Sequence, residues 1–234
     1  MAGFGFGGTN GSNIRPRVIY DAKAGKLFRA DRVEDNDGWK TQRTELKPGS
    51  PEAAFAVNIG SAVFGWVDFS QMPPKELLVP FTEGAAPPPR PAWHQPRPSV
   101  ELQIKLSKTA AAPDRQEGDY RQLASSALCV IAALGELKDT IVGAPEHDAG
   151  QVPVVSFADT KEQRTKHGTN WVPVLEVVKW IDPPEGFEDA TAFARGSAEP
   201  MGETAKQQAE RDIDFLDHDP LAGQQRAVEA VEEF

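Results

Sequence analysis

The most regular stretch of the 234-residue chain is SVELQIKL, residues 99–106. Apolar and polar residues alternate along it, so one face would carry Val100, Leu102, Ile104 and Leu106. Such a period of two is typical of a β-strand with one buried face, because successive side chains of a strand point to opposite sides. The stretch predicts a strand packed on an apolar core, and it favours a chain built mainly of β-structure.

Runs of β-branched and aromatic residues on both sides of this stretch predict further strands. Upstream, residues 17–32 predict two strands joined by a turn at Ala24 and Gly25, and residues 53–69 predict two more. Residues 35–38 read Asp-Asn-Asp-Gly, a strong turn signal. Three more strands are predicted at residues 77–81, 152–157 and 171–181.

One helix is predicted over residues 119–142. Apolar residues recur there at spacings of three and four, which is the period of a single helix face. Asp119 would cap its start, and Gly143 and Pro145 would end it. The single cysteine, Cys129, lies near this face, where a buried and unreactive thiol is expected.

The succession of strands, one helix and more strands favours a small barrel. We predict a fold that is mainly β with one long helix, an OB-fold-like five-stranded barrel with extra N-terminal strands. A β-sandwich is the alternative, but it does not predict a single long helix. The predicted divisions are a flexible glycine-rich arm at residues 1–13, the barrel domain at residues 14–182 and a disordered acidic tail at residues 183–234.

Negative charge is concentrated at the C-terminal end. The chain has a net charge of −10, and residues 183–234 contain 13 acidic and 4 basic residues, a net charge of −9. Because large apolar residues are scattered in this segment, it cannot bury enough surface to offset its ordering entropy. It is interpreted either as a solubilising tail or as a docking peptide that mimics nucleic acid, with apolar anchors such as Phe215, Leu216 and Phe234 among carboxylates.

The sequence lacks the usual signatures of catalysis and of metal or cofactor binding. One cysteine excludes an internal disulfide and a four-cysteine zinc site, and the four histidines show no metal-ligand spacing. No nucleophile-elbow or phosphate-loop motif occurs. No run of about 18 apolar residues is present and the start does not read as a signal peptide. We therefore expect a cytoplasmic protein that is not an enzyme and holds no cofactor.

Binding residues are more plentiful. Five tryptophans are present, and residues 161–171 form a basic segment that leads into the predicted strand at Trp171. Single-stranded nucleic acid is held by aromatic side chains that stack on bases and by cations that follow the phosphates. The alternative for each tryptophan is burial in the core, which suits Trp66 and Trp180 best. The candidate nucleic-acid-binding residues are Arg29, Trp39, Lys105, Lys108, Arg164, Lys166, Trp171 and Lys179.

The organisation resembles that of OB-fold single-stranded DNA-binding proteins of bacteriophage replication and recombination. The resemblance lies in SVELQIKL, the predicted helix over 119–142, the paired segments VPVVSF and WVPVLEVVKWID, and the acidic tail ending in AVEAVEEF. It implies sequence-independent binding of single-stranded DNA in the cytoplasm of a bacterial host. It also implies a tail that competes with DNA and recruits replication or recombination proteins, with Phe215, Leu216 and Phe234 as partner-binding residues.

A second function class stays open at this point. The chain could be a structural or adaptor protein, such as a virion component or a self-assembling β protein, that binds no nucleic acid. The sequence leaves open its oligomeric state, homo-oligomer included, and its preference for DNA or RNA.

Overall fold

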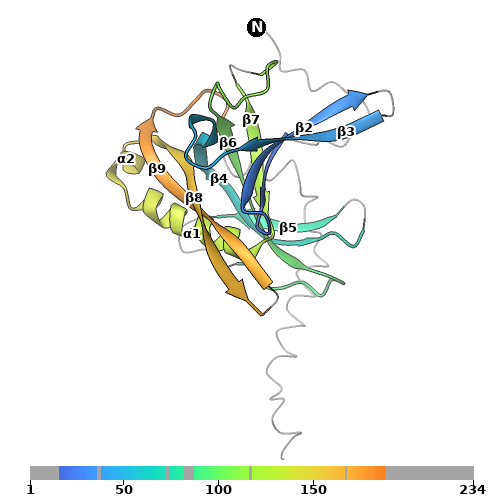
Figure 1. Ribbon diagram of the computed structural model, residues 1–234. Helices are drawn as coiled ribbons and strands as arrows, with labels where there is room; N and C mark the ends of the chain where they lie inside the picture. Colours follow the sequence, from blue (N-terminus) through green and yellow to red (C-terminus); the bar gives the residue numbers. More distant parts are fainter. Residues whose placement is uncertain are drawn as a thin grey trace, which may run out of the picture. The chain divides into compact units, whose positions relative to one another are not determined.

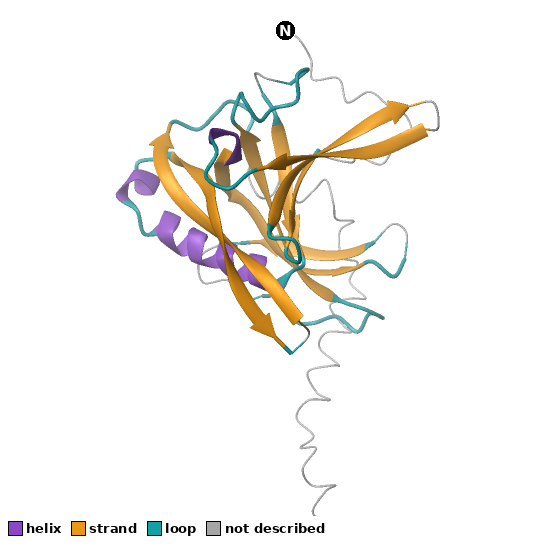
Figure 2. Cartoon of the chain, in the orientation of Figure 1, coloured by secondary structure: helices purple, strands orange, loops and turns teal. Residues whose placement is uncertain are grey.

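The computed structural model describes residues 16–35, 38–71, 74–81, 87–115, 118–166 and 168–187, apart from the side chains of Asp35 and Trp39. The predicted arm at residues 1–13 lies outside the described residues, as do residues 188–234 of the predicted tail with Phe215, Leu216 and Phe234. The described part is mainly β, which confirms the predicted class (Figures 1 and 2).

Nine strands belong to one sheet in the described part of the chain. They are β1 (Arg17–Asp21), β2 (Lys26–Asp35), β3 (Gly38–Leu46), β4 (Ala54–Asp68), β5 (Lys75–Pro80), β6 (Arg97–Leu106), β7 (Tyr120–Ser125), β8 (Val152–Thr165) and β9 (Gly168–Ile181). The helical segments are η1 (Pro51–Ala53), α1 (Leu128–Val142) and α2 (Pro145–Asp148). The prediction was a five-stranded OB-fold-like barrel with extra N-terminal strands and one long helix. In the described part all nine strands belong to one sheet, and α1 is shorter than the predicted helix over 119–142.

The sheet is curled, with the strand order β3-β2-β1-β7-β6-β4-β8-β9 (Figure 1). Long β4 holds it together, because its first half pairs with β8 and its second half with β5, while β6 runs along its other edge. Its register with β6 shifts between Asn58 and Val63. Residues 53–69 thus form one irregular strand where two were predicted.

Gly65 is required where β4 turns against β5. Its φ is +154°, and a Cβ built there would lie 1.9 Å from the carbonyl oxygen of Leu77. Only glycine lets the two backbones approach this closely.

The turn between β1 and β2 reaches across the curl to β9. The Trp171 N–H donates to the carbonyl of Ala22 at 2.7 Å, and the Tyr20 hydroxyl donates to the Trp171 carbonyl at 3.0 Å. Gly25, with φ +68°, lies under the indole, and a Cβ there would be 3.0 Å from Trp171 Cγ. This turn, predicted from the sequence, therefore ties the two halves of the sheet together.

The predicted helix over 119–142 is wrong in its first part. Residues 120–125 form β7, which lies between β6 and β1 in the sheet, and α1 begins only at Leu128. The spacing of Tyr120, Leu123 and Ala124 suits a helix, but the segment pairs with β6 along its whole length and with β1 at two positions. Such tertiary pairing overrides local propensity.

The core lies between the curled sheet and α1. Phe55, Ile104, Phe157 and Ile141 are at most 1% exposed, and they come from β4, β6, β8 and α1. Cys129 is also buried in this cluster, as the sequence predicted. The strand predicted at residues 99–106 is confirmed, and its apolar face contributes Val100, Leu102, Ile104 and Leu106 to the core. Its polar face is not exposed as a strand with one buried face would require, because Glu101 and Gln103 are also buried.

Candidate functional site

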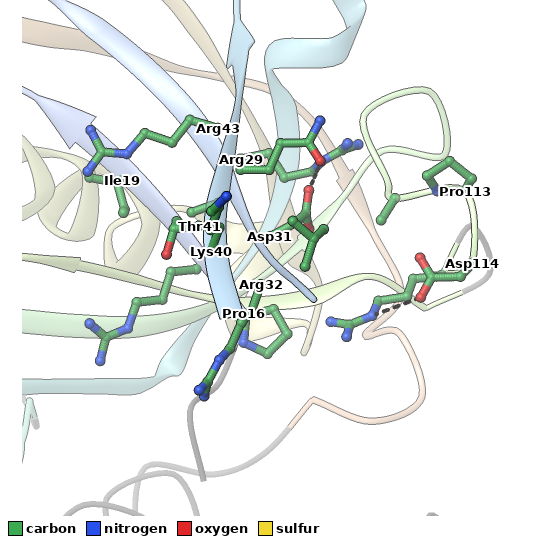
Figure 3. Close-up of a pocket in the computed structure, with 16 residues that line it drawn as sticks. Pro16, Ile19, Arg29, Asp31, Arg32, Lys40, Thr41, Arg43, Pro113 and Asp114 are labelled. Atoms are coloured by element: carbon green, nitrogen blue, oxygen red, sulfur yellow. Dashed lines mark hydrogen bonds and ion pairs between the residues drawn. The ribbon is translucent and has the colours of Figure 1, made fainter. Parts of the chain in front are cut away.

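The described part of the chain contains an open groove of about 780 Å³. Its walls are β1, β2 and β3 on one side and residues 112–115 on the other (Figure 3). Six cationic side chains line it, against two carboxylates, those of Asp31 and Asp114. The cations are Arg17, Arg29, Arg32, Lys40, Arg43 and Arg115. Among the described residues that line the groove, cations therefore outnumber carboxylates, although the whole chain has a net charge of −10.

Strand register places three arginines of this groove, Arg17, Arg32 and Arg43, on one face of the sheet. Arg17 of β1 lies opposite Ala30 of β2, and Ala30 lies opposite Arg43 of β3. Paired residues share a face of the sheet, and Arg32 shares it too because it follows Ala30 by two residues. Figure 3 shows Arg29, Arg32 and Arg43 pointing in different directions, and Arg29 lies on the other face of β2 because it is adjacent to Ala30.

Arg29 is the one sequence-predicted cation that lines this groove. Its Nε is 2.8 Å from Asp31 Oδ2, its Nη1 donates to the Ala110 carbonyl at 2.7 Å, and its Nη2 donates to Thr44 at 3.4 Å. Arg29 therefore also joins β2 to β3 and to the loop after β6.

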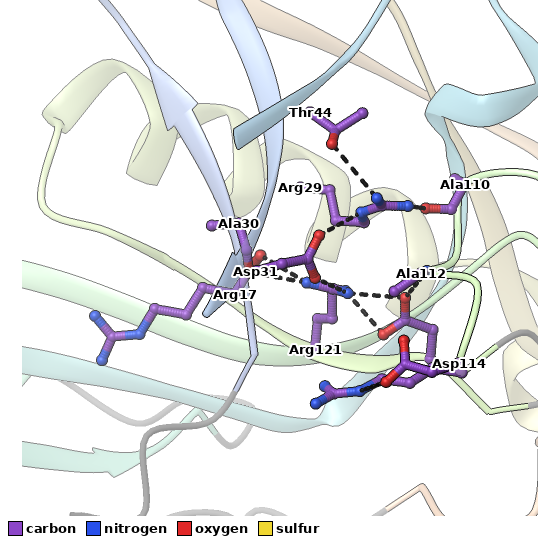
Figure 4. Close-up of polar contacts among 11 residues, drawn as sticks. Arg17, Arg29, Ala30, Asp31, Thr44, Ala110, Ala112, Asp114 and Arg121 are labelled. Atoms are coloured by element: carbon purple, nitrogen blue, oxygen red, sulfur yellow. Dashed lines mark hydrogen bonds and ion pairs between the residues drawn. The ribbon is translucent and has the colours of Figure 1, made fainter. Parts of the chain in front are cut away.

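Asp31 is shared between Arg29 and the buried Arg121 of β7. Its Oδ1 is 2.6 Å from Arg121 Nη2 (Figure 4). Burial raises the pKa of Asp31, but the hydrogen bond and charge of Arg121, together with Arg29, outweigh burial and lower it below the usual value. The carboxylate stays ionised and holds both guanidinium groups in place.

Lys105 and Lys179 lie in one row across the sheet. Lys105 is opposite Ala56, Ala56 is opposite Val154, and Val154 is opposite Lys179. The two lysines therefore share a face but are three strand spacings apart, about 14 Å. The Nζ of Lys105 also lies 5.2 Å from the centre of the Tyr120 ring.

The predicted basic loop at residues 161–171 is not a loop over most of its length. β8 continues to Thr165 and β9 begins at Gly168, so Arg164 lies in a strand and Lys166 in the turn. Arg164 is 84% exposed and pairs with Glu162 at 2.8 Å. The prediction was wrong because it took a run of polar residues as a sign of a loop. Polar residues can also form the exposed end of an antiparallel hairpin.

Trp171 is half-buried, with its indole against Gly25 rather than at an open loop end. Lys108 is exposed in the loop after β6. Trp39 lies in β3 opposite Glu34, and its side chain is outside the described residues. None of the predicted residues apart from Arg29 lines the groove, so the structure does not gather the predicted set into one hollow.

The predicted site omitted Arg17, Arg32, Lys40, Arg43 and Arg115, which do line the groove. The turn predicted at residues 35–38 could have indicated part of this set. If the residues before and after that turn are paired as an antiparallel hairpin, Asp35 lies opposite Gly38 and Ala30 lies opposite Arg43, as observed.

The described residues offer no group of three or more His, Cys, Asp and Glu side chains that could hold a metal ion. No helix among them has the length and apolar character needed to cross a membrane. Comparisons of the whole chain with protein-family models, curated proteins and solved structures gave no match.

Proposed function

We propose that the protein binds single-stranded nucleic acid, without sequence preference, in the arginine-lined groove. The observation that carries this proposal is the surplus of positive charge among the residues of the groove, in a chain that is acidic overall. Guanidinium groups suit phosphate because their planar donors match its oxygens. Cations spread over three strands suit a row of phosphates better than a single phosphate group.

The size of the groove favours a single strand over a duplex. A hollow of about 780 Å³ holds a ligand of the size of a few nucleotides. A duplex could touch only its rim, whereas a single strand can enter. Ile19, Val33 and Pro16 also line the groove and provide apolar surface for sugars and bases.

The same chemistry supports sequence independence. Phosphates are identical in every nucleotide, and contacts to them position a strand without reading its sequence. Apolar packing against the face of a base is also independent of sequence, because every base has such a face.

The proposal extends to the parts inferred from the resemblance to phage proteins. The curled sheet would serve as the OB-fold-like barrel, in replication or recombination in a bacterial host cell. The acidic tail would compete with DNA for the groove and recruit partner proteins through Phe215, Leu216 and Phe234. Lys105, Lys108, Arg164, Lys166, Trp171 and Lys179 would then contact DNA only where a strand continues beyond the groove.

A salt titration of oligo-dT binding, followed by fluorescence anisotropy, tests the proposal. Six cations against two carboxylates leave a surplus of four charges in the groove. Release of counterions then predicts a slope of log K against log salt of about −3, from roughly −0.7 per neutralised phosphate. Replacing Arg32 and Arg43 by alanine should weaken binding and reduce the slope to about −1.4.

The matched control removes two charges elsewhere. Lys75 and Arg97 are exposed, on β5 and β6, and neither lines the groove, so their replacement by alanine should leave the slope nearly unchanged. A third variant with alanine at Arg164 and Lys166 tests the end of the β8–β9 hairpin separately. Equal losses in all three variants would contradict binding in the groove, and no binding by the wild-type protein would favour the structural or adaptor function.

A further inference from the structure

Arg121 is a charged side chain with no access to solvent. It lies on β7, directly behind the groove, and its side chain is 0% exposed, as is that of Asp119. Its Nε is 2.8 Å from Asp119 Oδ1 and its Nη2 is 2.9 Å from Oδ2, so the two groups form a bidentate pair (Figure 4).

The same guanidinium reaches two strands of the groove. Its Nη1 donates to the carbonyl of Ala30 at 2.9 Å and, more weakly, to that of Arg17 at 3.5 Å. Its Nη2 contacts Asp31 Oδ1 at 2.6 Å. Arg17, Ala30 and Asp31 all line the groove, on β1 and β2.

Asp119 contacts the other side of the groove, which is formed by residues 112–115. Its Oδ2 accepts a hydrogen bond from the Ala112 N–H at 2.8 Å, and Ala112 belongs to the loop segment that lines the groove. The Arg29 bond to Ala110 ties this loop to β2 a second time. One buried ion pair therefore contacts groove residues from β1, β2 and the loop.

We infer that Arg121 and Asp119 are positioning residues of the groove, which set the separation of its walls without touching the ligand. This inference rests on the proposed binding function. A buried ion pair is a weak source of stability, and apolar replacements of similar size often keep a protein folded. The four contacts that the pair makes to β1, β2 and the loop are better explained by a need for defined geometry.

The decisive variant replaces Arg121 by methionine and Asp119 by leucine together, in the full-length chain. Apolar side chains at both positions avoid leaving one buried charge unpaired. We expect far-UV circular dichroism like that of the wild type and oligo-dT binding about tenfold weaker, equivalent to ~1.4 kcal/mol. Hydrogen exchange of the Ala112 amide should become faster, because its acceptor is gone, while β4 and β6 stay protected.

Two further variants separate positioning from general stability. Phe157→Leu removes packing from the core at a fully buried site away from the groove, so it should lower stability without changing the salt slope. Arg121→Lys keeps the positive charge opposite Asp119, but one ammonium cannot span Asp31 and the carbonyls. It should weaken binding several-fold and reduce the salt slope, and it serves as the test if the double variant does not fold.

The outcomes also separate this inference from the proposed function. If the wild-type protein shows no salt-dependent binding, the proposed function fails. If it binds, and a folded Arg121 variant binds with the same affinity and slope, the positioning role alone is refuted. Weaker binding with a reduced slope in the Arg121 variants, but not in Phe157→Leu, supports it.

Discussion

The contact between Gly25 and Trp171 allows a quantitative test of how the curled sheet is held. Gly25 has φ +68°, and a Cβ there would lie 3.0 Å from Trp171 Cγ and 3.1 Å from Trp171 Cβ. The indole cannot move away easily, because the Trp171 N–H is bonded to Ala22 at 2.7 Å and its carbonyl to Tyr20 at 3.0 Å.

Gly25→Ala should therefore destabilise the protein for two separable reasons. The left-handed backbone conformation costs an alanine about 1 kcal/mol. Crowding against a fixed side chain adds about 1–3 kcal/mol. The expected loss in the free energy of unfolding is about 2–4 kcal/mol.

A double-mutant cycle separates the two terms. In Trp171→Gly both crowding atoms, Cγ and Cβ, are absent, so adding Gly25→Ala should cost only about 1 kcal/mol and leave a coupling of about 1–3 kcal/mol. Urea unfolding followed by far-UV circular dichroism measures all four proteins without relying on indole emission.

Gly150 provides the matched control. It has φ +81°, but nothing lies within 4 Å of its would-be Cβ, so Gly150→Ala should cost about 1 kcal/mol in either background. A cost of Gly25→Ala that is the same with and without Trp171 would refute the packing of this turn on β9.

Two other predictions follow from local contacts. Gly65→Ala should destabilise by roughly 3 kcal/mol or more, because its Cβ would overlap a carbonyl of β5, whereas Gly135→Ala in α1, with open space around it, should stabilise by about 0.5–1 kcal/mol. Thermal melts of both variants check this, and equal melting temperatures would contradict it. Hydrogen bonds from Ser70 and from the Gln95 N–H lower the pKa of Asp68 to about 2. Because the unfolded value is about 3.9, stability should fall as the pH drops from 4 to 2, and Asp68→Asn should lose part of that dependence; an unchanged pH profile would refute the assignment.

Local patterns were enough to identify most strands. Residues 99–106 alternate strictly, and the turn at Ala24 and Gly25 is formed by its own residues, with Gly25 at positive φ and the Asp21 carboxylate accepting from two N–H groups of the turn. Such signals are short-range, because side-chain direction in a strand depends on neighbouring residues alone. The same holds for the charge asymmetry, since counting residues requires no coordinates.

Residues 119–125 show where local reasoning failed. Their apolar spacing favours a helix, and only the neighbouring edges of β6 and β1 make them a strand. Because the segment was predicted as a helix, there was no reason from the sequence to place Arg121 in the sheet beside the groove.

The groove depends on strand registers and on one long-range loop contact. Arg17, Arg32 and Arg43 lie on three successive strands, and they become neighbours through the registers of β1 with β2 and β2 with β3. Residues 112–115 join them only because Asp119 and Arg29 hold the intervening loop. Sequence composition shows that cations are present. Only the hydrogen bonds between neighbouring strands place Arg17, Arg32 and Arg43 on one face, because a register shift of one residue would move a side chain to the other side of the sheet.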